Sequence, residues 1–285
     1  MAEGAGDKMP LEERTPAEGQ DKLDSRLNSL ALSSSVDDKY RYHMNHKNRG
    51  HFIIINNKNF DSSTNMGNRN GTDEDAANLY QRFKELGFDV KSYNNLKKIQ
   101  MLKVMTDASR WDHSECDCFG CAMLSHGDEG VVYGTDGQIA LDRLIQPFKG
   151  PQSYTLRGKP KIFIIQACRG DQLDHGVEVQ SDSEVPIEEK VYRIPVEADF
   201  VYAYSTVAGY YSWRNSTKGS WFIQAMCKML KQHAYNMNFV QILTRVNYEV
   251  AYEFESNASK ESMNKKKQVP SIVSMLTKDL IFNRK

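Results

Sequence analysis

Apolar runs bounded by polar, turn-forming residues divide the chain into alternating elements from about residue 40 onward. The continuous apolar run His51–Asn56 is typical of a strand that is buried on both faces. Thr72 stands three residues before Asp75, and this spacing predicts a capping pair at the start of a helix. Apolar residues then follow at helical spacing from Ala76 until Gly87 ends the run. The ordered region is therefore predicted to open with a strand, a loop and a helix.

The same alternation continues to the end of the chain. Further strands are predicted at 88–93, 119–124, 161–167, 200–205 and 272–275. Further helices are predicted at about 96–109, 141–148, 220–235 and 239–254. Strands that alternate with helices indicate an α/β fold, with a mostly parallel sheet covered on both faces. We find no internal repeat.

Two polar segments interrupt this pattern. Residues 1 to 38 are rich in Glu, Asp, Ser and Gly and contain no aromatic residue, so we expect a disordered leader. Between Asp171 and Glu189 there are seven carboxylates and no Lys or Arg, which predicts a solvated linker inside the chain. We expect one large domain, because 285 residues suffice for a full α/β core.

Composition narrows the classes of function. Lys plus Arg and Asp plus Glu both number 37, so no global field favours nucleic acid or an anionic membrane. No apolar run has the length of a secretory signal or a membrane span, and we expect a cytoplasmic protein. The five cysteines are odd in number and unevenly spaced, which argues against a disulfide framework and suits a reducing compartment.

Two candidate reactive residues follow predicted strands. His126 comes after the strand that ends at Leu124, and Cys168 comes after the strand that ends at Ala167. If these strands are parallel neighbours, both side chains lie at one edge of the sheet, as a thiol and its base require. Taken alone, a cysteine is usually a small buried apolar residue and a histidine a structural one. Their pairing at one edge favours function.

The chemistry expected of this pair is peptide hydrolysis. The Cys168 thiolate would attack a carbonyl carbon, and His126 would give a proton to the departing amine. Backbone N–H groups would hold the oxyanion, with Gly127 and Cys168 as the candidate donors. Gly127 has no side chain to obstruct a substrate.

The pentapeptide Gln166-Ala-Cys-Arg-Gly170 resembles the signature of the caspase family, whose catalytic histidine lies about 50 residues upstream. Here His126, in Ser-His-Gly, precedes Cys168 by 42 residues. Other segments also resemble effector caspases, and the likeness extends from about residue 40 to the end of the chain. These segments are 53–60, 70–79, 124–130, 194–206, 209–216 and 219–226.

The resemblance implies a caspase-like three-layer sandwich, with a six-stranded, mostly parallel sheet flanked by helices. It also implies a chain that is cut into two subunits, and a homodimer of the processed units. We expect a prodomain at 1–38, a large subunit at 39–174, a linker at 175–192 and a small subunit at 193–285.

The resemblance also implies a pocket for the substrate aspartate. Arg69, Gln166 and Arg214 match the family residues that grip this side chain. The physical reason is that a buried carboxylate is costly unless it is paired, and two guanidiniums with an amide donor can saturate its oxygens. Glutamate would place its carboxylate one methylene too far, so specificity for aspartate follows.

Aromatic residues beside this pocket have two interpretations. From spacing alone, core packing is the simpler explanation. The resemblance instead implies that Tyr211 and Trp213 form the walls of the adjoining pocket and Trp221 the wall of the outermost one. It further implies that Ser212, Arg214 and Asn215 hold the substrate backbone by strand-like pairing.

The chain departs from the family pattern at two places. The stretch Ser256–Lys267 lacks the aromatic residues with which effector caspases often close the outer pocket. Gln180 stands where a cleavage aspartate is expected in the linker, so Asp182 is the first substitute and Asp174 the second. In the leader, Asp21-Lys-Leu-Asp24 has the form D-x-x-D, and self-processing after Asp24 is a hypothesis.

One group of residues loosely has the spacing of metal ligands: His113, Cys116, Cys118 and Cys121. Cys121 falls within a predicted strand, where alternation would split the four side chains between two faces. We therefore predict no metal site and no cofactor.

The leading hypothesis is an effector caspase, a zymogen that executes apoptosis by cutting protein substrates in exposed loops that contain aspartate. The short leader favours an effector over an initiator, and an upstream protease would activate it. One alternative is a non-catalytic scaffold or decoy, which should have lost a catalytic or pocket residue. Another is an arginine- or lysine-specific relative, which would need acidic pocket residues. We expect no nucleic acid or membrane partner.

Overall fold

The protein is described by a computed structural model for residues 39–170, 198–215, 217–257 and 261–285. The chain divides into two compact units, Met1–Arg41 and Tyr42–Lys285, and the second carries every element described below. The predicted leader, and the predicted linker as far as residue 192, lie outside the described residues.

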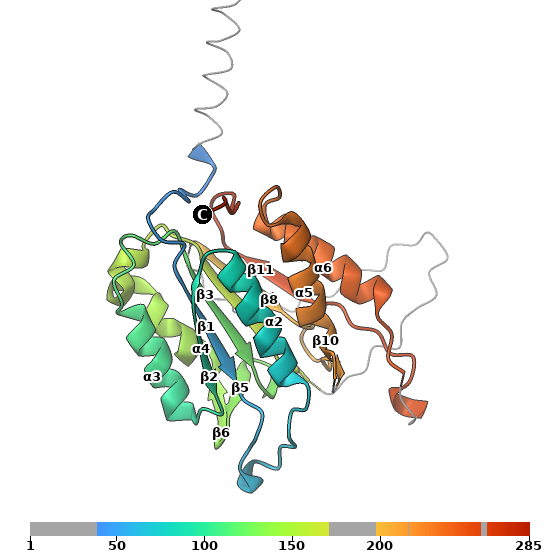
Figure 1. Ribbon diagram of the computed structural model, residues 1–285. Helices are drawn as coiled ribbons and strands as arrows, with labels where there is room; N and C mark the ends of the chain where they lie inside the picture. The colour runs from blue at the N-terminus through green and yellow to red at the C-terminus, as the bar shows by residue number, and fades with distance from the viewer. Residues whose placement is uncertain (1–38, 171–197, 216, 258–260) are drawn as a thin grey trace, which may run out of the picture. The chain divides into compact units, whose positions relative to one another are not determined.

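A six-stranded sheet forms the centre of the second unit (Figure 1). Its spatial order is β11 (Ser271–Ser274), β8 (Phe200–Tyr204), β7 (Lys161–Gln166), β3 (Phe119–Leu124), β1 (His51–Asn56) and β2 (Asp89–Asn94). All neighbouring strands are parallel except β11, which runs antiparallel to β8. The predicted mostly parallel sheet is confirmed.

Helices cover both faces of this sheet, which gives three layers (Figure 1). Alternation along β1 explains how one strand serves both layers, because Phe52 and Ile54 face one core while Ile53 and Ile55 face the other. The first core includes residues of α2 (Thr72–Glu85), α5 (Trp221–His233) and α6 (Phe239–Glu253). The second includes residues of α3 (Lys98–Ser109) and α4 (Leu141–Ile145).

Two local predictions are wrong. Gly71, at a φ of 84°, precedes the first residue of α2, and Thr72 does not cap the helix because its hydroxyl donates to Asn56 Oδ1 at 2.8 Å. The predicted helix at 141–148 is α-helical only as far as Ile145 and continues as a 3₁₀ turn, Gln146–Phe148. Pro147 lacks the N–H that a further α-helical turn would need.

Short elements connect the main ones, and apart from Gln146–Phe148 the sequence patterns did not predict them. One small sheet contains β4 (Gly127–Asp128), β5 (Val131–Gly134) and β6 (Gly137–Ala140), and β9 (Arg214–Asn215) pairs with β10 (Gly219–Ser220). The 3₁₀ helices are Ser62–Thr64, Gln146–Phe148, Gly150–Leu156 and Glu261–Met263. Strands of two to four residues are too short for an alternation pattern to show.

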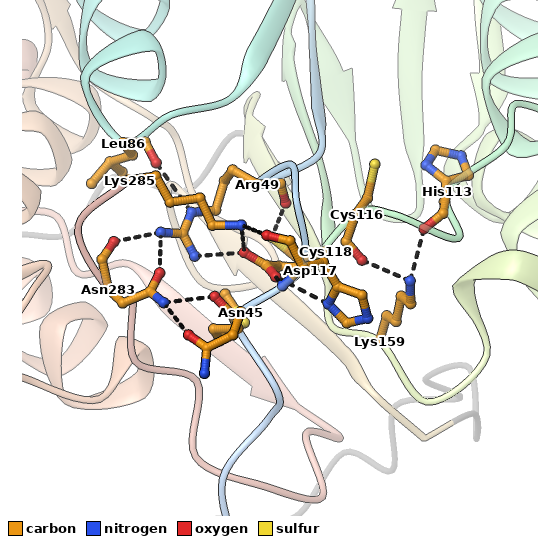
Figure 2. A network of polar contacts seen from close by, with 12 residues as sticks. Asn45, Arg49, Leu86, His113, Cys116, Asp117, Cys118, Lys159, Asn283 and Lys285 are labelled. Atoms are coloured by element: carbon orange, nitrogen blue, oxygen red, sulfur yellow. Dashed lines mark hydrogen bonds and ion pairs between the residues drawn. The ribbon is translucent and has the colours of Figure 1, made fainter.

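A buried ion-pair network fastens the C-terminal segment near the start of β1 (Figure 2). Arg49 Nη1 lies 2.9 Å from Asp117 Oδ2, and both side chains are fully buried. Lys285 Nζ lies 2.6 Å from the same carboxylate oxygen, and Arg49 also donates to Asn283. The shared carboxylate compensates both cations, as burial of charge requires. None of the helices in the described part of the chain has the length and apolar character of a membrane span.

Candidate active site

The two reactive residues lie at neighbouring strand ends. Strands β3 and β7 are parallel neighbours, and Leu124 is in register with Gln166. His126 and Cys168 each follow this pair by two residues, and Ser125 N donates to Gln166 O at 3.2 Å. The prediction that both belong to one edge of the sheet is confirmed.

The His126 ring is fixed by the loop that follows β1. Its Nε2 lies 2.7 Å from Gly67 O, and because a carbonyl only accepts, Nε2 carries the hydrogen. The Phe60 ring packs beside it with a centroid distance of 4.8 Å. Burial lowers the pKa of His126 below 6.5, the Gly67 bond raises it, and Arg69 and Arg214 lower it. The imidazole is therefore neutral at pH 7, with a lone pair on Nδ1.

Gly127 lies in a space that admits no side chain. A Cβ at this position would stand 2.8 Å from Ala167 Cβ and 3.0 Å from Cys168 O. Such distances are shorter than real Cβ contacts, so glycine permits the close approach of the two strand ends.

Arg69 lies near the sheet edge that carries His126 and Cys168. It is almost completely buried, with 1% of its surface exposed. Its Nη1 donates to Asn57 O at 3.2 Å and to Thr72 Oγ1 at 2.7 Å. Burial, and then repulsion from Arg214, lower the pKa of Arg69 from 12.5 to about 9, while Asp75 raises it. Two cations held close together in a region of low exposure form a site that favours an anion.

Hydrogen bonds position the other two predicted pocket residues, Gln166 and Arg214. Gln166 Nε2 donates to Ser212 Oγ at 2.8 Å, whereas its Oε1 is buried without a hydrogen-bond partner. Arg214 Nε donates to Asn70 O at 2.8 Å, and burial lowers the pKa of its guanidinium. Arg69 Nη2 lies 3.5 Å from Gln166 O, and the charge of Arg214 acts on Arg69, so the three predicted pocket residues lie close to one another.

Asp75 is a member of this site that the sequence interpretation missed, because it was assigned to a helix cap. Its Oδ1 accepts from Ser220 N at 2.8 Å, and its Oδ2 is buried without a partner. Burial raises the pKa of Asp75 from 3.8 to about 6, although Arg69 and Arg214 act to lower it. The carboxylate lies on α2 in the field of the two guanidiniums, but their attraction does not outweigh the cost of burying its charge.

This geometry predicts how stability depends on pH. Because the pKa of Asp75 is raised in the folded chain, its contribution to stability is present below 3.8 and is lost as the pH rises to about 6. We expect Asp75→Asn to increase the free energy of unfolding at pH 7 by on the order of 2 kcal/mol. Urea unfolding from pH 4 to 7 measures this difference.

Asp73→Asn, in the same turn of α2, is the matched control for the Asp75 substitution. Its hydrogen bond from Lys58 lowers the pKa of Asp73, so the sign is opposite and no stabilisation should appear. Equal effects of the two substitutions on the pH dependence would contradict the role given to the buried carboxylate.

The predicted aromatic residues form one continuous stack. Trp213 lies parallel to Trp221 at 5.7 Å, and Tyr211 meets Trp213 edge-on at 5.3 Å. Trp221 also stacks on Phe254 at 5.5 Å. Trp221 belongs to the hydrophobic core, while Tyr211 is 36% exposed. The cluster therefore extends from the core to the surface, so one end packs in the core and the other is accessible. Phe254, just before the stretch without aromatics, was missed in the sequence.

Ser212 and Asn215 have distinct surroundings. Ser212 is buried against Gln166. Asn215 closes the turn between β9 and β10, where its Oδ1 accepts from Thr217 N at 2.9 Å and Lys218 N at 3.0 Å. The predicted processing residues Asp24, Asp174 and Asp182, together with Gln180, lie outside the described residues.

A separate pocket of about 360 Å³ also reaches Cys168. Val131, Leu141 and Ile165 give it an apolar lining. Its cation, Arg169, lies 2.9 Å from Glu129 Oε1 and over the Tyr204 ring at 4.3 Å. This pocket offers one cation, which Glu129 already pairs, whereas Arg69 and Arg214 are two cations near the single carboxylate of Asp75, so the Arg69 and Arg214 site is the better match to an anionic side chain.

Comparison with known proteins agrees with this geometry. Residues 49–281 match the caspase domain. The chain is 49% identical over 260 residues to Caspase-7 of Gallus gallus, covering 87% of this chain and 84% of the relative. It is 53% identical over 254 residues to Caspase-3 of Oryctolagus cuniculus, covering 89% and 90%. The crystal structure of Caspase-1 from Spodoptera frugiperda matches with a TM-score of 0.78 and 44% identity, covering 86% of this chain and 96% of that one.

A thiol and an imidazole at parallel strand ends, within a three-layer fold that matches the caspase domain over most of the chain, define a cysteine protease. The chain belongs to the caspase family. It is an effector caspase, a hydrolase that cleaves protein substrates after aspartate, made as a zymogen and acting in apoptosis.

Proposed function

We propose that Cys168 is the nucleophile and His126 its acid–base partner. The neutral imidazole would take the thiol proton, the thiolate sulfur would bond to the substrate carbonyl carbon, and the protonated ring would then give its proton to the leaving amine. Water would release the acyl group from sulfur in a second, similar step. Backbone N–H groups of Gly127 and Cys168 are the proposed oxyanion donors. This assignment is supported by the register that sets both residues two positions beyond Leu124 and Gln166.

The substrate aspartate is proposed to bind Arg69, Gln166 and Arg214. The observation that carries this proposal is the pair of guanidiniums: burial lowers the pKa of both, and repulsion from Arg214 lowers that of Arg69 further. An entering carboxylate would relieve that repulsion and restore both pKa values toward 12.5. A peptide library, cleaved by the wild-type chain, tests the specificity; cleavage after residues other than Asp would reject the pocket.

Gln166 would join the pocket through a rotated amide. The two ends of an amide are nearly isosteric, and a half-turn would let Oε1 accept from Ser212 Oγ. The two Nε2 hydrogens would then occupy the buried position where Oε1 now has no partner. The carboxylate oxygens would receive an amide donor in addition to both guanidiniums.

The aromatic stack is proposed to receive the neighbouring substrate side chains. Tyr211 and Trp213 would line the adjoining pocket, and Trp221 with Phe254 would line the outermost one. The parallel stacking of Trp213, Trp221 and Phe254 supports a flat apolar wall. Ser212, Arg214 and Asn215 are proposed to pair with the substrate backbone.

The neutral state of His126 has a consequence for pH dependence. Activity should fall toward acid as the ring becomes protonated and can no longer take the thiol proton. Because burial lowers the pKa of His126, the acid limb of kcat/KM should have its midpoint below 6.5. Initial rates with an aspartate peptide, measured in constant-ionic-strength buffers, give this midpoint. A limb at or above 6.5 would count against His126 as the base.

Activation is proposed to follow cleavage of the chain at aspartates. Prodomain removal would occur after Asp24, and separation of the large subunit (39–174) from the small subunit (193–285) would occur in the linker, after Asp182 or Asp174. An upstream protease would make the first cut. Intact-mass spectrometry of an active preparation tests the sites; intact bonds after Asp24 and Asp182 would reject those two assignments.

The working unit is proposed to be a homodimer of processed chains in the cytoplasm, without nucleic acid or membrane partners. Its support is that β11 stands at the end of the sheet order, where it pairs with one strand among those of the described residues. Such an edge can pair with a second chain. Analytical ultracentrifugation of the processed enzyme tests this state.

A further inference from the structure

A cluster of nitrogen and sulfur ligands lies at the opposite end of the sheet from Cys168. Among the described residues, one group of three potential metal ligands was found: His51, His113 and Cys116, whose ligand atoms all lie within 4.8 Å of one another. His51 begins β1, and the other two precede β3. Five residues of strand separate His51 from Asn56 at the catalytic edge, which is about 16 Å at a rise of roughly 3.3 Å per residue.

His113 presents an unused lone pair. Its side chain is buried, and its Nε2 lies 2.9 Å from Ala108 O, which can only accept. Nε2 therefore carries the hydrogen, and Nδ1 is the basic nitrogen of the neutral ring. That Nδ1 is buried and has no hydrogen-bond partner. The ring nitrogen of a neutral histidine is a common metal ligand.

His51 is oriented in the way that metal-binding histidines usually are. Its Nδ1 lies 3.1 Å from Asp89 Oδ2, so the carboxylate receives the ring hydrogen and leaves the lone pair on Nε2. The Trp111 ring packs against it with a centroid distance of 4.9 Å. The side chain is 24% exposed, which leaves this side of the cluster open to solvent.

Cys116 is held in place by its loop. Lys159 Nζ donates to the carbonyl oxygens of His113 and Cys116 (Figure 2) and to that of Ser114, each at 2.7 Å. Cys116 N also donates to His113 O at 2.9 Å. The thiolate, not the thiol, is the metal ligand, so a bound cation would replace the proton of Cys116.

We propose that His51, His113 and Cys116 form a binding site for a divalent zinc-type cation. Two imidazole nitrogens and one thiolate suit Zn²⁺, and a water on the open side of His51 would complete a tetrahedron. Binding breaks the S–H bond of Cys116, releases that proton to solvent and forms a metal–sulfur bond. Cys118 and Cys121, which the spacing had grouped with His113, lie in or beside β3 and do not belong to the cluster.

The bound ion would connect β1 with the loop before β3 and would leave the catalytic edge untouched. Its expected effect is a higher Tm, because a ligand that binds the folded chain alone stabilises it. The full-length Cys168→Ala chain is the protein to test, since it removes the catalytic thiol as a competing ligand and prevents self-cleavage.

The experiment titrates the metal-free Cys168→Ala chain with Co²⁺ and then displaces it with Zn²⁺. One equivalent of Co²⁺ should bind and give a thiolate-to-cobalt charge-transfer band with the strong visible bands of a tetrahedral site. Cys116→Ala should abolish the charge-transfer band. His51→Ala, at a partly exposed position, should weaken binding by more than about a hundredfold, and Asp89→Asn by about ten- to a hundredfold. Cys227→Ala is the matched thiol control and should keep both the band and the affinity.

Zinc should raise the Tm of the Cys168→Ala chain and of its Cys227→Ala derivative, but not that of the His51→Ala derivative. Far-UV circular dichroism checks that each variant is folded. Co²⁺ binding without a charge-transfer band would overturn the proposal. Unchanged affinity in a folded His51→Ala variant, or the absence of stoichiometric binding to the Cys168→Ala chain, would overturn it as well.

Discussion

Replacing Cys168 by alanine is expected to lower kcat for an aspartate peptide by on the order of 10⁶-fold, the cost of removing the nucleophile from a protease catalytic unit. The remaining chain keeps the proposed oxyanion donors and the proposed pocket, but no atom of alanine can form the acyl intermediate. Substrate binding should persist, because Arg69, Gln166 and Arg214 are unchanged. Kinetics with a fluorogenic peptide measure the loss, and fluorescence anisotropy with a labelled, uncleaved peptide measures binding.

Cys227→Ala is the matched control for this substitution. Cys227 lies on α5 and packs against the hydrophobic core, and burial raises the pKa of its thiol to about 12, so it is not a nucleophile at pH 7. Its replacement should leave kcat within a few-fold of the wild type. Persistent cleavage in Cys168→Ala, or an equal loss in both variants, would refute the assignment of Cys168.

Continuous apolar runs in the sequence correctly predicted the central strands of this enzyme. Strands β1, β3 and β7 are unbroken apolar runs that are buried on both faces, and these runs also give the edge where His126 and Cys168 stand. The family resemblance brought Arg69, Gln166 and Arg214 to the same edge from distant segments. The structure confirms the strand register and brings Arg69 close to Gln166, while the substrate-binding roles stay predictions.

The remaining features depend on pairing between distant segments, which no local pattern reports. Asp75 has the spacing of a capping residue, but its partner Ser220 arrives from β10. His51 meets His113 because β1 and β3 are neighbours in the sheet, and spacing alone suggested Cys118 and Cys121 instead. Phe254 completes the aromatic stack from the end of α6. In each case the decisive contact is tertiary.

Replacing Arg214 by methionine is expected to lower kcat/KM for an aspartate peptide by about 10³-fold, since truncating one partner of a buried charge pair costs about 2–5 kcal/mol. Arg214 is less buried than Arg69, and its hydrogen bond to Asn70 O is made by Nε alone. The fold should therefore tolerate this change better than one at Arg69. The same peptide with asparagine should lose less than about tenfold, because no carboxylate was paired. Selectivity for Asp over Asn should thus fall by about a hundredfold or more.

Two further variants distinguish a specific ion pair with the substrate carboxylate from the general positive potential of the surface. Lys218→Met removes an exposed cation from the turn between β9 and β10, and its effect on kcat/KM should be within a few-fold. If Lys218→Met and Arg214→Met lowered the rate alike, the positive potential of the surface would explain the preference, and the proposed pocket would be wrong. Arg214→Lys keeps the charge but loses the planar fork, so it should recover only part of the rate. Full recovery by lysine would show that a point charge suffices, and that the bidentate grip on the substrate carboxylate is not what selects aspartate.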